Sequence, residues 1–480
     1  MTGYYGFLFR GDQATYIGLA KDVLFLGSFS DNIYPVSSLL VATITLTTGL
    51  SPENLAAGVA SLYFIIFFIG ISLLCRFFKR DNRILIISVL MFSTPFIFNW
   101  FPLTIYPHML STYFMPFIMY FTLIRKNNFI IYLLITNLAF FHPFIIFSYL
   151  LFLIFYIFIY KKFHLFYALI YGAVLFVSSM IYNSIIFNSL ILYYDSLINR
   201  DFTTIDVAFE YASKLGIINS LKTLSILILD DAFMYLSLFI IYIYLNYTKI
   251  SNVIKNKILN YFYIWIILTS IVILFLFVGI RGHVPDRLLN LNWGLVFAPI
   301  VLGCSYLSIK SKIKKIVVVS FLILISVTSI YALYPSPLTT RPNEANLYGE
   351  VSGAYWTLTY RMDESKYSYL LTTPLRYCDL IYGTKYYYRS NLHIGYVESG
   401  DSYVVPSHFN MSVSDRNFLG ARYFILTQYE ITAYCHIWNE VDKFNYEDFN
   451  KLNNDYSSYM LYNNKIYYLY LIDFYKFNKN

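Results

Sequence analysis

Charged residues are scarce in this chain of 480 residues. Asp, Glu, Lys and Arg make up 13% of it, whereas a soluble protein of this size carries roughly 25%. The shortage is concentrated in the first two thirds of the sequence, and hydrophobic residues reach 58% overall. This composition excludes an ordinary soluble protein and predicts a membrane protein with a more polar C-terminal part.

We also expect no cleavable signal peptide, since the first residues, Met-Thr-Gly-Tyr-Tyr, form neither a basic region nor an apolar core. Cysteines number only four. Cys75 and Cys304 fall in apolar segments and are most simply buried small side chains. Cys378 and Cys435 fall in the polar C-terminal part, where we expect a disulfide between them if that part is extracytoplasmic.

Long apolar runs follow one another from residue 53 onward and predict an α-helical polytopic membrane protein with about ten transmembrane helices. The predicted spans are 53–78, 84–98, 105–124, 129–141, 143–160, 165–186, 232–247, 259–280, 288–307 and 316–333. Several are shorter than the roughly 20 residues that cross a bilayer, so neighbouring helices or flanking aromatic residues must complete them. Before the spans we expect a loop over 7–35 that carries Asp12, and a surface helix over 34–50.

Basic residues concentrate in alternate loops between these spans. The loops contain Arg76, Lys79, Arg80 and Arg83; Arg125 and Lys126; Lys161 and Lys162; Lys249, Lys255 and Lys257; and Lys310, Lys312, Lys314 and Lys315. Because loops rich in Lys and Arg stay in the cytoplasm, the opening loop, the loop after the sixth span, the 281–287 loop and the C-terminal part are predicted outside. The net charge of +8 follows from this topology, so no nucleic-acid partner is expected.

An outside N-terminus needs explaining, because no preceding segment translocates it. Either the short N-terminus crosses on its own, or a first span precedes this sequence. From residue 334 the chain becomes polar and rich in tyrosine. Helix-like segments at 344–360 and 446–452 and strand-like runs at 369–373, 423–427 and 465–472 predict a small α/β domain. We therefore expect an outer loop with surface helices (1–52), a transmembrane domain (53–334) and an extracytoplasmic domain (335–480).

One resemblance rests on particular residues. The segment 10–22, Arg-Gly-Asp-Gln-Ala-Thr-Tyr-Ile-Gly-Leu-Ala-Lys-Asp, resembles the first outer loop of membrane glycosyltransferases with the GT-C fold, in particular those related to protein O-mannosyltransferases and aminoarabinose transferases. The pairs Tyr34-Pro35 and His142-Pro143 and the run 285–288, Pro-Asp-Arg-Leu, are similar too. The resemblance covers most of the chain as a pattern of loops and spans.

The resemblance implies transfer of a sugar from a polyprenyl-phosphate donor to an envelope glycan, lipid or protein acceptor at the outer face of the cell membrane. The loop acid of the family, matched here by Asp12, binds the acceptor or a divalent cation, or acts as the base. The other candidate substrate-binding residues are Arg10, Gln13, Tyr16, His108, His142, Arg281, His283 and Arg287. Gln13 departs from the Glu of many relatives, and the second outer loop, 99–106, lacks an acid that several relatives carry.

The chemistry needs a base for the acceptor proton and cations for the departing phosphate. A carboxylate serves as the base, and arginine offers a two-pronged contact to phosphate. Each assignment has a structural alternative. Asp12 is also suited to cap a helix start, Arg281 and Arg287 to anchor in lipid headgroups, and His108 and His142 to serve as structural residues at span ends.

Two other functional classes stay open. A transporter or lipid-flipping protein would need polar or charged groups within its spans. A non-catalytic envelope protein would keep the fold and present the C-terminal domain.

Overall fold

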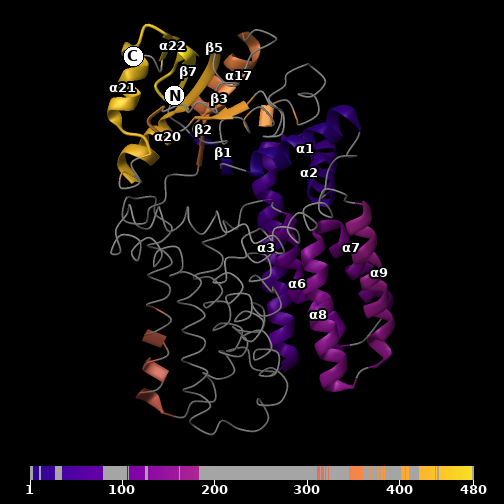
Figure 1. The fold of residues 1–480 in the computed structure, drawn as a ribbon. Coiled ribbons are helices and arrows are strands. Elements are labelled where there is room, and N and C mark those ends of the chain that lie inside the picture. The colour runs from indigo at the N-terminus through magenta and orange to yellow at the C-terminus, as the bar shows by residue number, and fades with distance from the viewer. Residues whose placement is uncertain are drawn as a thin grey trace, which may run out of the picture.

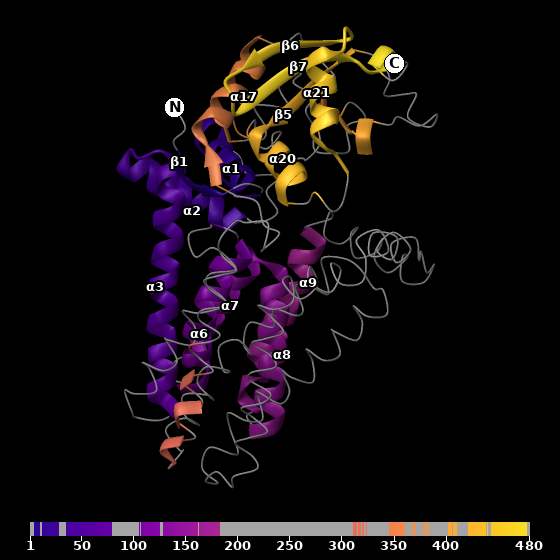
Figure 2. The same ribbon diagram turned by 90° about the vertical axis from the view of Figure 1, so that its left-hand side faces the viewer.

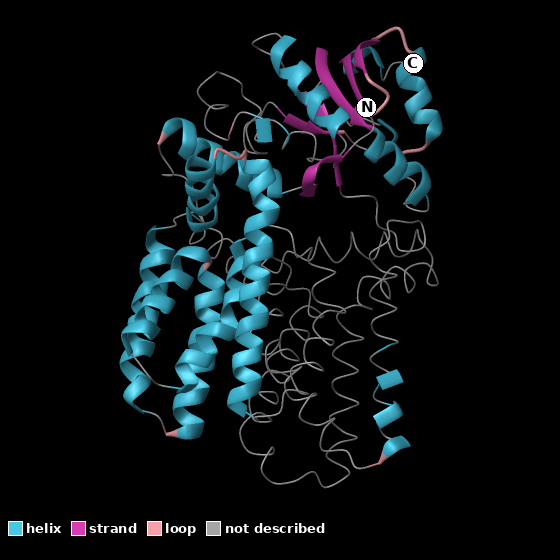
Figure 3. Cartoon of the chain, turned by 180° about the vertical axis from the view of Figure 1, so that it is seen from behind, coloured by secondary structure: helices cyan, strands magenta, loops and turns pink. Residues whose placement is uncertain are grey.

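The computed structural model of the chain is mostly helical, with its strands gathered at one end (Figures 1 and 3). It describes residues 4–9, 12–27, 35–78, 105, 107–124, 128–161, 163–182, 311–313, 315–317, 319–320, 323, 345–360, 367–369, 377, 380–381, 383, 402–405, 407–409, 421–437, 439 and 443–477. The expected combination of an apolar helical part and a small C-terminal α/β domain is confirmed at this level.

Five apolar helices lie side by side below the sheet (Figures 1 and 2). They are α3 (Pro52–Phe78), α6 (Pro107–Ile124), α7 (Asn128–Phe141), α8 (Pro143–Tyr160) and, after the 3₁₀ turn η1 (Phe163–Leu165), α9 (Phe166–Tyr182). Their bounds agree closely with five of the predicted spans. Four further predicted spans, 84–98, 232–247, 259–280 and 288–307, lie outside the described residues, and 316–333 is described only in part.

Length separates α3 from the other apolar helices. Within the described part of the chain, the segment Pro52–Phe77 is the one helix both long and apolar enough to cross a membrane by itself. Shorter apolar helices cover Pro35–Thr48, Leu110–Ile124, Phe129–Phe141, Ile145–Phe158 and Phe166–Ser179.

Prolines set the starts of three of these helices. Pro52, Pro107 and Pro143 are the first residues of α3, α6 and α8, where the missing N–H costs no helical hydrogen bond. The helix predicted over 34–50 is confirmed as α2 (Pro35–Thr48), and its place at a membrane surface stays a prediction. It ends at Gly49, whose φ of 72° is a left-handed conformation that glycine adopts without strain.

The helices α3 and α6 approach each other closely at Gly70. A Cβ added to Gly70 would lie 2.8 Å from the backbone nitrogen of Phe117 and 2.9 Å from the Cβ of Pro116. Polar pairs join the other helices: the Thr122 and Tyr149 hydroxyls lie 2.6 Å apart between α6 and α8. The small residue and the paired hydroxyls are the contacts expected between helices in an apolar environment.

The C-terminal domain is built on a five-stranded mixed sheet in the order β4-β3-β5-β7-β6. The strands are β3 (Tyr367–Tyr369), β4 (Ser402–Val404), β5 (Ala421–Thr427), β6 (Ser458–Asn463) and β7 (Tyr467–Asp473). The first three in the sheet order run parallel, and β7 pairs antiparallel with both β5 and β6. The helical segments of this domain are α17 (Tyr348–Tyr360), η2 (Ser407–Phe409), α20 (Gln428–Thr432), the π-helix η4 (Ala433–Ile437), α21 (Tyr446–Asn454) and α22 (Phe474–Phe477).

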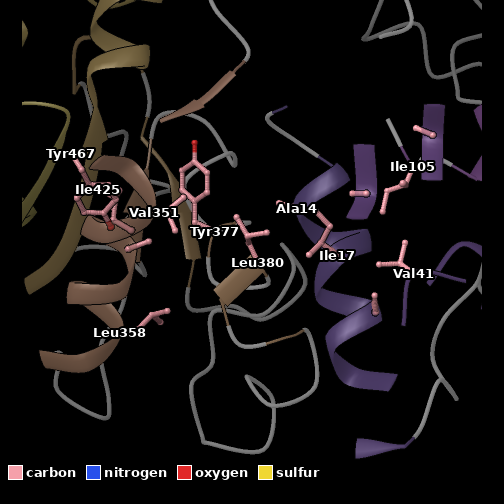
Figure 4. Close-up of a cluster of buried hydrophobic side chains, with 14 of the residues drawn as sticks. Ala14, Ile17, Val41, Ile105, Val351, Leu358, Tyr377, Leu380, Ile425 and Tyr467 are labelled. Atoms are coloured by element: carbon pink, nitrogen blue, oxygen red, sulfur yellow. The ribbon is translucent and has the colours of Figure 1, made fainter. Parts of the chain in front are cut away.

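Two hydrophobic clusters pack on the opposite faces of this sheet. We call them the inner and the outer cluster. The outer cluster lies under η2, α21 and α22 and includes Phe409, Phe424, Phe444 and Tyr470. The inner cluster joins the domain to the helices, because Val351, Ile425 and Tyr467 share it with Ala14 and Ile17 (Figure 4). The sheet therefore rests on the N-terminal helices through one continuous core.

The N-terminal segment corrects the prediction of a loop over 7–35. Residues Tyr4–Phe9 form the strand β1 and Asp12–Leu26 form the helix α1. The strand β1 pairs antiparallel with β2 (Ala345–Leu347), so the N-terminal strand and the start of the C-terminal domain form a small second sheet. The helix forms because Ala14, Ile17 and Ala20 are completely or almost completely buried in the inner cluster, a tertiary contact that local sequence does not reveal.

The predicted strands 423–427 and 465–472 and the predicted helix 446–452 are confirmed as β5, β7 and α21. Of the predicted strand 369–373, only Tyr369, the last residue of β3, is described, and the strand β4 was not predicted. The segment predicted as a helix over 344–360 begins with β2 and becomes helical only at Tyr348. The strand β6 was not predicted, because its side chains are mostly exposed and show no alternation; it forms by pairing with β7.

Candidate functional site

Asp12 is the first residue of α1. Its side chain and Arg10 lie outside the described part of the chain. The backbone position fits the interpretation of Asp12 as an acid at a helix start, where carboxylates are favoured by the free N–H groups. A catalytic role of the same carboxylate stays a prediction.

The next two candidates on α1 face into the protein. The side chain of Gln13 is completely buried, and Tyr16 is partly buried against the inner cluster. Both residues therefore take part in holding α1 in place.

The start of α6 lies close to α1. Ile105, completely buried two residues before α6, belongs to the inner cluster with Ala14 and Ile17 (Figure 4). His108 is the second residue of α6, so this end of the helix lies toward α1. The position of the His108 side chain is not described.

His142 connects α7 and α8 and is 2% exposed. Its N–H donates to the Leu138 carbonyl at 3.1 Å, and its carbonyl accepts from the N–H of Ile145 at 3.1 Å. The backbone of this residue thus ends one helix and begins the next, and a substrate-binding role of its side chain stays a prediction. Arg281, His283 and Arg287 lie outside the described residues, so their predicted role in binding the donor phosphate stays a prediction.

A group of charged residues that sequence analysis did not single out holds α1 against the C-terminal domain. We call Lys21, Asp22 and Glu53, with the backbone of Leu380, Ile381 and Gly383, the junction cluster. The Lys21 ammonium lies 2.6 Å from Glu53 Oε1, and both side chains are nearly buried. It also donates to the carbonyls of Leu380 at 2.6 Å and Ile381 at 3.3 Å. One lysine therefore contacts α1, the start of α3 and the C-terminal domain.

Asp22 adds a second contact to the same segment. It is 3% exposed, and its Oδ1 lies 2.4 Å from the position that a Cβ on Gly383 would take. Gly383 also has a φ of 85°, a conformation that side chains disfavour. The adjacent charges Lys21 and Asp22 were the visible signal in the sequence, but the carbonyls that Lys21 contacts in the C-terminal domain lie 359 and 360 positions away.

A buried carboxylate secures the other side of this junction. Glu350, in the first turn of α17, is completely buried, and its Oε2 accepts hydrogen bonds from the Tyr377 hydroxyl at 2.8 Å and the Leu347 N–H at 3.2 Å. Tyr377 and Leu380 belong to the inner cluster and lie between its N-terminal and C-terminal members (Figure 4). The segment around them thus bridges α1 and the sheet.

Titratable groups also meet at the outer cluster, beside α21. His408 Nδ1 lies 2.8 Å from Asp448 Oδ2, which accepts the Asn445 N–H as well. Burial, and next the Asp448 carboxylate, raise the pKa of the Cys435 thiol above its usual value. Cys435 forms no disulfide within the described residues and packs against the outer cluster. Cys378 lies outside the described residues, so a bond between them stays a prediction.

Metal ligands do not gather in the described residues, which contain no group of three His, Cys, Asp or Glu side chains placed to hold an ion. The chain matches no protein-family model, and no curated protein matches it significantly. The candidate site is therefore defined by its own geometry: a helix with an acid at its start, fixed between an apolar helical bundle and an α/β domain.

Proposed function

We propose that the protein is a polytopic membrane protein of GT-C-like architecture with about ten transmembrane helices. Exposed apolar side chains support this. On α9, Ile170, Val174 and Val177 are about half exposed and follow the spacing of one helix face. Leu62, Ile65 and Ile69 do the same on α3. Stripes of this size on several parallel helices are costly in water and favourable in lipid.

The proposed orientation places the C-terminal domain outside. Arg76 lies in the last turn of α3, and Lys161 directly follows α8. The helical pieces between 311 and 323, with Lys312 and Lys315, lie at the end of the bundle opposite the sheet (Figures 1 and 2). The described residues of 71–78, 158–165 and 311–323 include no Asp or Glu. In the sequence, Asp81 is the one acid of the basic loops, and such an excess of Lys and Arg is typical of a cytoplasmic face.

We further propose that the activity is glycosyl transfer from a polyprenyl-phosphate sugar to an envelope glycan, lipid or protein acceptor. The observation that carries this proposal is the placement of α1. The helix that Asp12 begins is held in one core with the end of the bundle and the C-terminal domain. A site there would meet both a lipid-borne donor and a soluble or surface acceptor.

The reaction would be a single displacement at the anomeric carbon. The acceptor hydroxyl attacks that carbon and gives its proton to the Asp12 carboxylate. The bond between the anomeric carbon and the phosphate oxygen breaks, and its electron pair leaves with the polyprenyl phosphate. Arg281 and Arg287, with His283 nearby in sequence, would stabilise that phosphate. A divalent cation bound at Asp12 is a further part of the proposal.

Replacing Asp12 with Asn tests this function. Loss of a general base lowers turnover roughly 100-fold or more, and we expect expression and donor binding to stay nearly intact. Arg287→Ala should weaken donor binding as well, because the phosphate is already present in the ground state. Purified protein would be incubated with radiolabelled polyprenyl-phosphate hexoses and pentoses, in the presence and absence of Mg²⁺ or Mn²⁺.

The matched control is Asp473→Asn, which removes an acid at the end of β7 that pairs with Lys476 at 3.5 Å. Its turnover should equal that of the unaltered protein. Full turnover by the Asp12→Asn protein would contradict the catalytic assignment.

A non-catalytic envelope protein is the second candidate. Lys21 of α1 is engaged by other parts of the protein, and Asp22 is buried against them, as expected of a helix with a structural task. Absence of transfer from every donor, with an unchanged fold, would favour it. A transporter receives less support, since α6, α7, α8 and α9 contain no Asp, Glu, Lys or Arg.

A further inference from the structure

The junction cluster consists of groups that no substrate needs to touch. A lysine ammonium has three N–H donors, and Lys21 has three acceptors within reach: Glu53 Oε1, the Leu380 carbonyl and the Ile381 carbonyl. Its hydrogen-bonding capacity is therefore used inside the protein. This arrangement excludes Lys21 as a ligand for a donor phosphate in the same state.

The three contacts come from three different parts of the chain. Lys21 lies on α1, Glu53 in the first turn of α3, and Leu380 and Ile381 follow Tyr377 in the C-terminal domain. Gly18, Lys21 and Asp22 share one face of α1. The backbone at Gly383 approaches that face so closely that its added Cβ would lie 3.2 Å from the Gly18 carbonyl. The same short segment of the C-terminal domain thus touches α1 at two successive turns.

The free energy of the buried Lys21–Glu53 ion pair favours a role in positioning α1 over a role in stability. A buried ion pair recovers little net stability, because removing two charges from water costs about as much as their attraction returns. Its value lies in geometry: a charged group with fixed partners tolerates few alternative positions. The apolar contacts of Ala14 and Ile17 bury one side of α1. The hydrogen bonds of Lys21 fix the position of α1 along its axis and its rotation about that axis.

We propose that Lys21 is a positioning residue through which the C-terminal domain fixes α1, and with it Asp12, relative to the end of the bundle. The catalytic consequence rests on the proposed function; the positional one does not. The C-terminal domain would then contribute to the geometry of the membrane site. The backbone carbonyls of Leu380 and Ile381 would fix the position of α1, the helix that begins with Asp12.

Distances between spin labels test the positional part in the full-length protein. Labels would be attached to cysteines at Phe25, which is 71% exposed on α1, and at Tyr459, which is 62% exposed on β6, in a background without the native cysteines. We expect one narrow distance distribution in the background protein and a broadened or shifted one in Lys21→Met. Lys21→Arg, which keeps the charge and the donors, should restore most of the narrow distribution.

Two further variants keep the test decisive if Lys21→Met alone folds poorly. The double variant Lys21→Met with Glu53→Gln leaves no unpaired carboxylate behind, yet still loses the link to residues 380 and 381. Gly383→Ala disturbs the same contact from the C-terminal side. Both should broaden the distribution. The matched controls are Lys476→Met, at an exposed lysine, and Gly58→Ala, where an added Cβ meets nothing within 4 Å.

Turnover with the radiolabelled donor is the second measurement. Displacement of a catalytic group by about 1 Å costs on the order of 100-fold in rate, so kcat of Lys21→Met should fall by about that factor while KM for the donor stays unchanged. Unchanged distance distributions in the double variant and in Gly383→Ala would overturn the proposal. Changed distributions in a protein without any transferase activity would uphold the positioning role and reject the proposed function.

Discussion

At the scale of single residues, buried ionisable groups join segments that are far apart in the sequence. Lys21 reaches carbonyls that are 359 and 360 positions away. Glu350 accepts a hydrogen bond from Tyr377, 27 positions further on. Each of these groups is almost enclosed by protein, so each hydrogen bond also removes a desolvation cost that an unpaired partner would incur.

The thiol of Cys435 allows a prediction on pH. Its pKa is raised by burial and then by the Asp448 carboxylate, so less thiolate is present at pH 8 than in a free cysteine. Because only the thiolate reacts, we expect slow alkylation by iodoacetamide at pH 8. The rate should rise with pH and level off above the usual thiol range. Asp448→Asn should increase the rate at pH 8 by removing the negative charge.

This experiment uses a variant with Cys75, Cys304 and Cys378 replaced by Ser. Glu447→Gln is the control, because Glu447 is an exposed acid on the same turn of α21 and is not a cause of the shift. An alkylation rate equal to that of a free cysteine would contradict the prediction.

At the scale of elements, helix bounds were predictable where the sequence contains local signals. Pro52, Pro107 and Pro143 mark three starts, and the uninterrupted apolar runs fix the extents of α3, α7 and α8. The helix α1 lacked such a signal. Gln13 and Asp22 interrupt its apolar pattern, and both are buried by contacts with other elements.

The crossing of α3 and α6 provides a stability prediction. Gly70→Ala would force an added Cβ to within 2.8 Å of the α6 backbone at Phe117. The two helices would have to separate, at a cost of about 1–3 kcal/mol in the free energy of unfolding. Gly58→Ala lies on the same helix in open space and should leave stability unchanged or slightly increased.

Denaturation by SDS in mixed micelles, followed by circular dichroism, measures both variants. Equal stability of the Gly70→Ala and Gly58→Ala proteins would mean that the close approach of α3 and α6 is not required for folding.

At the scale of the whole molecule, the two ends of the helical bundle differ in the elements and the charges that they carry. The sheet, α1 and α2 lie at one end, and the basic helix ends lie at the other (Figures 1 and 3). Between them, polar pairs join α6 to α8 and α7 to α9, and α3 and α9 expose apolar stripes. This distribution agrees with a bundle surrounded by lipid.

Topology is the prediction at this scale. In a background without native cysteines, single cysteines at Lys126 and Lys312 should resist a membrane-impermeant maleimide in intact cells. Single cysteines at Asp201 and Ser402 should react, because the loop after the sixth span and the C-terminal domain are predicted outside. Permeabilised cells serve as the control for reactivity. Labelling of the Lys126 position in intact cells would overturn the proposed orientation.

The sequence by itself determined the apolar helical class, the bounds of α2, α3, α6, α7 and α8, and the strands β5 and β7, because hydrophobic runs, alternation and prolines are local properties of the chain. Only the tertiary structure decided that Tyr4–Phe9 pairs with Ala345–Leu347, that α1 is a helix, and that Lys21 joins α1 to residues 380 and 381. These features depend on burial and hydrogen bonds between segments hundreds of residues apart, and no local pattern records which distant backbone group will complete a buried charge.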